Sequence, residues 1–260
     1  MSAIVLKNVS KSYRTGHIGF TREIRGVEDL NLEVREGEIF GLLGLNGAGK
    51  TTTIKLILGL LYPTRGEVYM WGKLMPDRMA LRNVGYLPEI ISLYKYLTGP
   101  EILNIFADLS RIPGQEKRVR IEKVLTEVGL VHAAKKRTGE YSKGMLQRLG
   151  LAQALLHEPE LLIFDEPITG LDPLALKEMR HLMLELKSWG RTVFFSSHHI
   201  SEVEKVCDRV GILVNGRIEK VLEQEQWRRR EGELEQVFVE TVGGSGEVGP
   251  LRVKKNIVKS

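Results

Sequence analysis

The stretch that decides the fold is a glycine-rich segment that ends in lysine and two threonines, Gly44-Leu45-Asn46-Gly47-Ala48-Gly49-Lys50-Thr51-Thr52. It matches the phosphate-loop pattern G-x-x-x-x-G-K-[ST] in full. The apolar run at residues 38–43 before it predicts a buried strand, and the apolar residues 53–61 after it predict a packed helix. Strand, glycine loop and helix in this order place backbone N–H groups and a helix N-terminus around an anion.

Each residue type of this loop has its own task in holding a polyphosphate. The glycines allow the backbone to close around the anion. Lys50 is expected to reach the β- and γ-phosphates, and the Thr51 hydroxyl to ligate Mg²⁺. The alternative is a glycine-rich turn with an accidental Lys-Thr, which leaves the flanking strand and helix unexplained. The residues expected to contact ATP are Gly44, Asn46, Gly47, Ala48, Gly49, Lys50, Thr51 and Thr52.

Length and composition are those of an ordinary globular protein. The 260 residues are 42% hydrophobic and 27% charged, which allows a sizeable core without disulfides. Cys207 is the only cysteine, so an intrachain disulfide is excluded and a reducing compartment is favoured. No apolar run approaches the roughly 20 residues of a membrane span, and residues 1–7 do not resemble a signal peptide. We therefore expect a soluble, cytoplasmic protein whose formal charge of +5 permits an anionic partner without requiring one.

The order of predicted elements indicates an α/β fold with an inserted helical part. Strands are predicted at residues 3–9 and 27–34, joined by a long loop at 14–26 that is rich in glycine and charge. Residues 88–159 hold only helical patterns, which suggests an α-helical lobe of about residues 90–159 inserted into the core. The three helices of this lobe are predicted at residues 101–110, 116–128 and 144–156.

Beyond the lobe, strands and helices alternate again, which predicts a mostly parallel sheet flanked by helices, besides an antiparallel N-terminal β part. The later elements are a strand at residues 161–166, a helix at 173–189, a strand at 192–197, and a hairpin of residues 209–214 and 217–221 around an Asn-Gly turn. Two further strands are predicted at residues 67–71 and 84–87. A Gly-Ser-rich, basic end follows, and we expect residues 226–260 to form a short extension with a flexible tail.

Ionisable residues follow two of these strands where a parallel sheet places its ligand site. Asp165 and Glu166 end one apolar strand, and His198 follows another. Because the carboxyl ends of parallel strands meet at one edge, these residues and the phosphate loop are expected to converge. Asp165 suits the Mg²⁺ shell, and Glu166 is placed to orient or deprotonate a water. The alternative is a carboxylate pair that only caps a strand end.

A second candidate anion site lies in the segment Tyr141-Ser142-Lys143-Gly144-Met145. Ser142 can cap the helix that follows, and with Lys143 at a helix N-terminus it can also face an anion. One nucleotide does not need two such sites from one subunit, whereas a dimer does if each subunit presents its second site to the partner's γ-phosphate. The simpler alternative is a helix cap beside a surface lysine.

Together these motifs resemble the ATP-binding subunit of ATP-binding cassette (ABC) transporters, over roughly residues 3–225. In the terms of that family, residues 44–52 are Walker A, 141–145 the signature, 161–165 Walker B and 170–173 the D-loop. The resemblance implies that Glu166 is the catalytic glutamate, His198 the switch histidine and Tyr13 the aromatic that stacks on adenine. As a simpler alternative, Tyr13 is an aromatic at the end of a strand. His199 is left without a role.

The departures from the family pattern point to one branch. Tyr141, Lys143 and Met145 differ from the usual Leu-Ser-Gly-Gly-Gln signature, and this form is similar to the drug-, sodium- and polysaccharide-efflux exporters. Residues 234–238 resemble the short C-terminal extension of that branch. Glu89 replaces the usual glutamine of the Q-loop, where a carboxylate can still face Mg²⁺ and the attacking water.

The resemblance implies an ATPase that dimerises, either with a second copy of itself or with a different ATPase chain. The two subunits would close head to tail around two ATP–Mg²⁺ and drive a membrane exporter. Its cofactors would be ATP and Mg²⁺, its partners transmembrane permease subunits on separate chains, and its location the cytoplasmic face of the cell membrane. No nucleic-acid partner is expected. The residues assigned are Lys50, Glu166 and His198 for catalysis, Thr51, Glu89 and Asp165 for the metal, and Ser142, Lys143, Gly144, Met145 and Asp172 across the interface.

Two other kinds of protein would use much of the same site. A soluble ABC ATPase of translation or DNA repair usually carries two cassettes or a long coiled-coil insertion, and this chain shows neither. A nucleotide-binding regulator would not need Glu166 and His198. Residues 1–225 are expected to form the ATPase domain, and residues 226–260 the extension. The transported cargo is not written in this chain.

Overall fold

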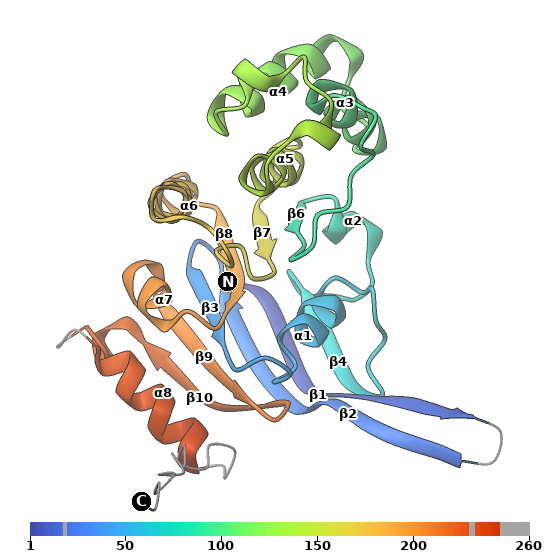
Figure 1. Ribbon diagram of the computed structural model, residues 1–260. Coiled ribbons are helices and arrows are strands. Elements are labelled where there is room, and N and C mark those ends of the chain that lie inside the picture. Colours follow the sequence, from blue (N-terminus) through green and yellow to red (C-terminus); the bar gives the residue numbers. More distant parts are fainter. Residues whose placement is uncertain (18–19, 229–231, 245–260) are drawn as a thin grey trace, which may run out of the picture.

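A six-stranded sheet crosses the molecule in the order β10, β9, β3, β8, β7, β6 (Figure 1). The computed structural model describes residues 1–17, 20–228 and 232–244. All neighbouring strands from β9 to β6 run parallel, and β10 adds an antiparallel edge. The strands are β3 (Ile39–Leu43), β6 (Val84–Leu87), β7 (Leu161–Phe164), β8 (Thr192–Ser197), β9 (Arg209–Val214) and β10 (Arg217–Glu223).

Alternate side chains of this sheet pack into two separate hydrophobic cores. In β3, Phe40 and Leu42 belong to one core, whereas Ile39 and Leu43 belong to the other. Strands β3, β7, β8 and β9 are buried along their whole length. This burial on both faces explains why their sequences are continuous apolar runs without alternation.

The first core lies between the parallel sheet, helix α1 (Lys50–Ile57) and a second, antiparallel sheet of order β2, β1, β4, β5. Ile54 and Ile57 of α1 meet Leu6 and Leu32 of the antiparallel sheet in this core. The antiparallel strands are β1 (Ser2–His17), β2 (Phe20–Arg35), β4 (Arg65–Met70) and β5 (Lys73–Leu74), and the short helix α2 (Arg78–Leu81) follows them.

The second core lies under α6 (Pro173–Ser188), α7 (Ile200–Val206) and α8 (Glu233–Gly244). Helix α8 lies in the expected C-terminal extension and ends at residue 244. Leu234, Phe238 and Val242 are spaced four residues apart and form a buried stripe on this helix. The expected flexible tail at residues 245–260 lies outside the described residues.

Three helices lie between β6 and β7 and form the upper part of the molecule in Figure 1. They are α3 (Gly99–Leu109), α4 (Gly114–Glu127) and α5 (Lys143–Leu155), and the predicted bounds agree within two residues at each end. Polar caps fix two starting points, because Thr98 forms a capping box with Glu101 and Ser142 Oγ accepts the Met145 N–H. The predicted α/β fold with an inserted helical lobe is confirmed.

The prediction of a long loop at residues 14–26 is wrong, because β1 and β2 continue through most of this stretch as one antiparallel ribbon. Main-chain pairing joins Tyr13 to Ile24 and continues to His17 and Phe20. In Figure 1 the ribbon extends away from the rest of the molecule. This stretch is rich in glycine and charged residues, which are typical of loops, so the sequence did not indicate strands here.

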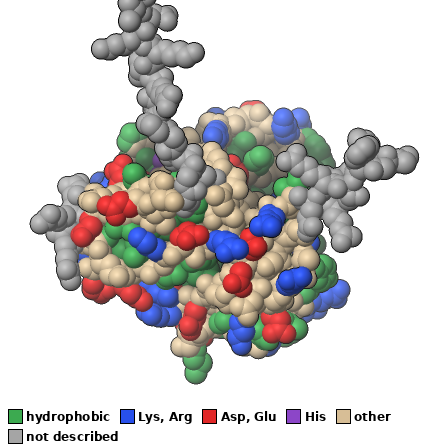
Figure 2. Space-filling model, turned by 90° about the horizontal axis from the view of Figure 1, so that it is seen from below, with side chains coloured by type: hydrophobic (Ala, Val, Ile, Leu, Met, Phe, Trp, Pro, Cys, Tyr) green, Lys and Arg blue, Asp and Glu red, His purple; other side chains and the backbone are tan. Residues whose placement is uncertain are grey.

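Charged side chains are mixed on the underside of the molecule, where acidic and basic groups lie among one another (Figure 2). This mixture agrees with the balance of 38 Lys and Arg against 33 Asp and Glu. Surface pairs such as Arg217–Glu28, with 55% of the arginine side chain exposed, are typical of it. Exposed pairs of this kind contribute at most about 1 kcal/mol each.

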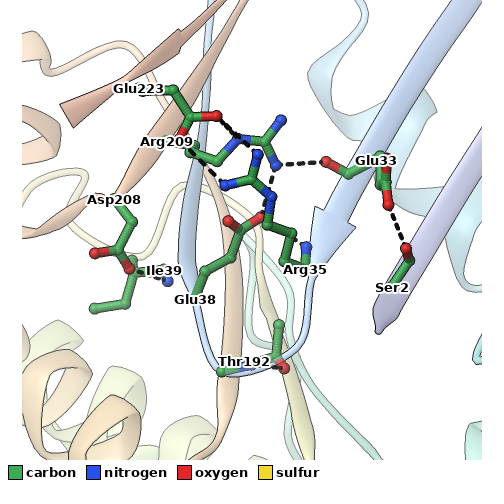
Figure 3. A network of polar contacts seen from close by, with 10 residues as sticks. Ser2, Glu33, Arg35, Glu38, Ile39, Thr192, Asp208, Arg209 and Glu223 are labelled. Atoms are coloured by element: carbon green, nitrogen blue, oxygen red, sulfur yellow. Dashed lines mark hydrogen bonds and ion pairs between the residues drawn. The ribbon is translucent and has the colours of Figure 1, made fainter. Parts of the chain in front are cut away.

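One buried ion pair connects the two sheets at the amino ends of the parallel strands (Figure 3). Arg209 of β9 lies 3.1 Å from Glu38, and the two side chains are only 10% and 7% exposed. Arg209 also donates to the Glu33 carbonyl of β2 at 2.9 Å and lies 3.1 Å from Glu223 of β10. Glu38 accepts the Arg35 N–H at 2.8 Å. Burial nevertheless raises the pKa of Glu38, so its charge depends on these donors.

We expect Arg209→Met to lower the free energy of unfolding by about 3–5 kcal/mol, because it leaves the Glu38 carboxylate buried without its cation. Urea denaturation measures the loss. Arg217→Met is the matched control and should cost at most about 1 kcal/mol, because its pair is exposed. The double variant Glu38→Gln/Arg209→Met should recover part of the loss. Equal losses for Arg209→Met and Arg217→Met would contradict a structural role of the buried pair.

Candidate functional site

The phosphate loop connects the carboxyl end of β3 to α1, and the helix begins at Lys50, earlier than predicted. Gly49 caps the helix with a φ of 107°, a left-handed conformation that favours glycine. A Cβ there would lie 2.7 Å from the Gly26 carbonyl oxygen, so a side chain has no room either. The first turn of α1 carries no side-chain cap and no acidic residue. No side chain of this turn therefore competes with an anion for its N–H groups.

The β9–β10 turn supports this loop from outside. The Gly216 N–H donates to the Ala48 carbonyl at 2.9 Å, and the Gly216 carbonyl accepts the Glu28 N–H at 2.7 Å. Gly216 has a φ of 79°, and a Cβ on it would lie 2.9 Å from Val27 Cα. The predicted Asn-Gly turn thus connects the phosphate loop to β2.

The Lys50 side chain is folded back over the loop and is only 6% exposed. Its ammonium donates to the carbonyls of Gly44 at 2.7 Å and Leu45 at 3.1 Å. It also lies 3.0 Å from Glu166 Oε1, and Glu166 is equally buried. A positive charge held above helix N–H groups in this way suits the oxygens of a polyphosphate.

Three strand ends bring the predicted acidic residues and histidine beside the loop. The parallel register pairs Phe164 of β7 with Phe195 of β8, and Leu43 of β3 with Ser197 of β8. Asp165 and His198, which follow β7 and β8, therefore lie next to the phosphate loop. Asp165 Oδ1 accepts from Ser196 Oγ at 2.7 Å and from Thr51 Oγ1 at 3.3 Å.

Glu166 is held in a strained conformation at the centre of the site. Its φ is +50°, and its N–H donates to Ser196 Oγ at 2.9 Å. Glu166 Oε2 accepts from Thr169 Oγ1 at 3.1 Å and lies 2.9 Å from His198 Nδ1. Glu166 Oε1 is buried and has no hydrogen-bond partner among the described residues, although the Lys50 ammonium is near.

His199 lies against His198, with ring centroids 4.1 Å apart. Burial and the neighbouring charge of His198 lower the pKa of His199. The lowered pKa favours a neutral His199 at pH 7.

The donor set beside Lys50 fits Mg²⁺. Thr51 and Asp165 supply a hydroxyl and a carboxylate, the hard oxygen ligands that this ion prefers together with water and phosphate oxygens. Within residues 1–17, 20–228 and 232–244, no group of three or more His, Cys, Asp or Glu could hold a metal ion. Mg²⁺ bound together with a polyphosphate usually takes only one or two ligands from the protein, and Thr51 and Asp165 would be these ligands.

Glu89 lies beyond the end of β6 and is exposed. No hydrogen bond or ion pair of the described residues joins it to Thr51 or Asp165. It is nevertheless close enough to affect Tyr86, whose pKa is raised to about 12 by burial and by the charges of Asp165 and Glu89. Its predicted role as a metal ligand stays a prediction.

Tyr13 lies within β1 and faces α1. Its hydroxyl lies 3.2 Å from Thr52 Oγ1. A Cβ on Gly26 would come within 2.6 Å of the Tyr13 ring, so the ring packs directly on that glycine. Lys11 lies 5.7 Å above the ring centroid. Tyr13 is thus fixed beside the phosphate loop.

The signature residues lie at the start of α5, in the helical lobe. Ser142 is exposed, and its hydroxyl caps the helix by accepting the Met145 N–H at 3.2 Å. A Cβ on Gly170 would come within 2.5 Å of the Lys143 ammonium, so this lysine covers the D-loop. Asp172 caps α6 by accepting the N–H groups of Leu174 and Ala175. No hydrogen bond or ion pair of the described chain joins these residues to Lys50.

Three polar residues of the site have no role assigned from the sequence. Ser196 bridges Asp165 and Glu166, Thr169 holds Glu166, and Gln147 Nε2 donates to the Pro167 carbonyl at 3.1 Å. Ser196 could have been found from the sequence, because it lies at the end of an apolar strand, where the site residues were expected. Thr169 and Gln147 carry no comparable pattern.

Comparisons with known proteins agree with this site. The protein-family model described as "ABC transporter" matches residues 27–169, more than half of the chain. An uncharacterised ABC transporter ATP-binding protein of Nostoc sp. is 48% identical over 219 residues, which are 84% of this chain and 65% of that protein. The bacitracin transport ATP-binding protein of Bacillus licheniformis is 47% identical over 197 residues, 75% of this chain and 63% of that protein.

The fold is also similar to a solved cassette. A dimeric structure of a post-hydrolysis state of an ATP-binding cassette, bound to ADP and Pi, has a TM-score of 0.77 and 27% identity, and the match covers 85% of this chain and 98% of that one. This chain spans less than two thirds of the length of the two curated relatives named above. The family match and the geometry around Lys50 agree, and the chain belongs to the ABC transporter family.

Proposed function

We propose that this chain binds and hydrolyses ATP and thereby powers a membrane exporter. The observation that carries the proposal is the cluster of Lys50, Asp165, Glu166 and His198 at the carboxyl edge of the parallel sheet. A cation for phosphates, oxygen ligands for a metal and a buried carboxylate beside them are the parts that phosphoryl transfer to water requires.

The loop and its neighbours would bind the nucleotide. Lys50 and the N–H groups from Gly44 to Thr52 would hold the phosphates, and Tyr13 would stack on the adenine. Thr51 and Asp165, with Glu89 as a further candidate, would hold Mg²⁺. The ion neutralises charge on the phosphate oxygens when bound.

Glu166 would act as the general base of hydrolysis. Its carboxylate is buried, is fixed by hydrogen bonds and lies beside the ammonium that binds phosphate. It would take a proton from the attacking water, while His198 contacts the γ-phosphate. Phosphoryl transfer depends on positioning and charge stabilisation, which a rigid site of this kind supplies.

Two copies would complete each site in a head-to-tail dimer. The helix N-terminus formed by Ser142, Lys143, Gly144 and Met145 lies far along the chain from Lys50. It would contact a nucleotide only across an interface, where it would face the nucleotide bound by the partner copy. The solved cassette bound to ADP and Pi is itself dimeric. Asp172 would line the same interface.

The partner proposed is a transmembrane permease on separate chains. One relative is a bacitracin transport ATP-binding protein, and the variant signature favours the exporter branch. Within the described residues, no helix has the length and the apolar content to cross a membrane. We infer a peripheral location at the cytoplasmic face of the membrane, with residues 1–225 as the ATPase unit and 226–260 as its extension.

Tyr13→Ala should weaken ATP binding about tenfold, because stacking on a base contributes about 1–3 kcal/mol while the phosphate contacts remain. Tyr13→Phe keeps the ring and loses only the contact with Thr52, so it should bind nearly as well as the wild type. Titration with a fluorescent ATP analogue measures both affinities. Equal affinity of Tyr13→Ala and the wild type would remove Tyr13 from the nucleotide site.

Glu166→Gln should slow ATP hydrolysis by about 10²–10⁴-fold, because the amide cannot accept the proton of water. ATP would then stay bound, and size-exclusion chromatography with ATP–Mg²⁺ should show the variant as a dimer and the wild type mostly as a monomer. Adding Ser142→Arg should abolish the dimer by blocking the interface.

Two results would count against the proposal. A Glu166→Gln variant with wild-type turnover would exclude Glu166 as the base. A dimer that persists with Ser142→Arg would exclude the head-to-tail arrangement. Co-purification of the wild type with a multi-span membrane protein tests the permease partner separately.

A further inference from the structure

Thr169 contacts Glu166 through both its hydroxyl and its main chain. Its hydroxyl donates to Glu166 Oε2 at 3.1 Å, and its N–H donates to the Glu166 carbonyl at 3.2 Å. The turn of residues 166–169 is thus closed by both main chain and side chain. Thr169 is half-buried between the Walker B strand and the D-loop.

Contacts from two other elements hold this turn in place. Gln147 of α5, which is buried, donates to the Pro167 carbonyl at 3.1 Å. Ser196 of β8 accepts the Glu166 N–H at 2.9 Å. Because the backbone of the turn is fixed at both points, the Thr169 hydroxyl has a fixed position relative to the carboxylate.

The two carboxylate oxygens of Glu166 have different surroundings. Oε2 accepts a hydrogen bond from the Thr169 hydroxyl and lies 2.9 Å from His198 Nδ1. Oε1 is buried without a hydrogen bond from the described residues, and its nearest charge is the Lys50 ammonium at 3.0 Å. A polyphosphate bound by Lys50 would compete for that ammonium and would leave Oε1 beside the phosphates as a free acceptor.

We propose that Thr169 is a positioning residue that holds Oε2, together with His198, and so presents Oε1 as the proton acceptor. This inference rests on the proposed hydrolysis of ATP. In that step, a lone pair of Oε1 takes a proton from water as the water oxygen bonds to the γ-phosphorus. The bond from the γ-phosphorus to the β–γ bridging oxygen breaks, which yields ADP and phosphate, and Oε1 later releases the proton to solvent.

The test compares Thr169→Val with Thr169→Ser. Valine keeps the branched shape and the N–H but loses the hydroxyl, whereas serine keeps the hydroxyl. We expect Thr169→Val to lower kcat by about 10–100-fold, the scale of a misplaced catalytic group. Its KM for ATP and its affinity for ATP without Mg²⁺ should stay within about twofold of the wild type. Thr169→Ser should recover most of the turnover.

A double-mutant cycle shows whether Thr169 acts through Glu166. In the Glu166→Gln background, Thr169→Val should cause no further loss of turnover, because the proton acceptor is already absent. Thr126→Val is the matched control for hydroxyl removal, since that hydroxyl donates to the Glu122 carbonyl on the exposed side of α4. Its kcat should equal that of the wild type.

Several outcomes would overturn the inference: wild-type kcat in Thr169→Val, a Thr169→Ser variant as slow as Thr169→Val, a raised KM with unchanged kcat, or additive loss in the Glu166→Gln background. Thr169→Ala, which should lose turnover equally, replaces valine if Thr169→Val does not fold. A wild type without ATPase activity would instead contradict the proposed function, so the two failures are distinguishable.

Discussion

The buried ion pair between Lys50 and Glu166 is the interaction on which the organisation of the site depends. Each charge loses its water, and a buried charge is tolerated only with partners of good geometry. Besides its contact with Glu166, the Lys50 ammonium donates to two loop carbonyls. The Glu166 carboxylate accepts from the Thr169 hydroxyl and lies next to His198 Nδ1. The phosphate loop and the end of β7 are thereby connected through a pair of side chains 3.0 Å apart, and His198 connects the end of β8 to the same carboxylate.

The parallel sheet makes this pair possible. Its strands are buried on both faces, so their register is fixed by two cores at once, and their carboxyl ends cannot shift relative to one another without loss of packing. At the opposite edge, Arg209 and Glu38 connect the antiparallel sheet to the same strands. The amino ends of the parallel strands thus hold the two sheets together, whereas their carboxyl ends hold the reacting groups.

The sequence predicted the core elements because their signals are strong: apolar runs of strand length, helix periodicity in the lobe, and a full phosphate-loop motif. It also predicted that Lys50, Asp165, Glu166 and His198 would meet, since strand ends in a parallel sheet share an edge. The outer part of the β1–β2 ribbon was missed because its glycines and charged residues are typical of a loop, and α8 because its stripe of Leu234, Phe238 and Val242 lies among charged and glycine residues. Thr169 and Gln147 were missed because a neutral polar residue in a turn or helix carries no pattern until its partner is known.

The contact of Gly216 with the phosphate loop determines where extra residues can be inserted into this chain. A two-residue hairpin turn is commonly a tolerant place for insertions, because it lies at the surface. Here the turn donates to Ala48 and accepts from Glu28, and its glycine has no room for a side chain. Added residues at Asn215-Gly216 would therefore move the nucleotide loop itself, whereas the projecting end of the β1–β2 ribbon is remote from it in Figure 1. Protein engineers who need to insert a tag or a reporter domain should choose the ribbon rather than the shortest turn.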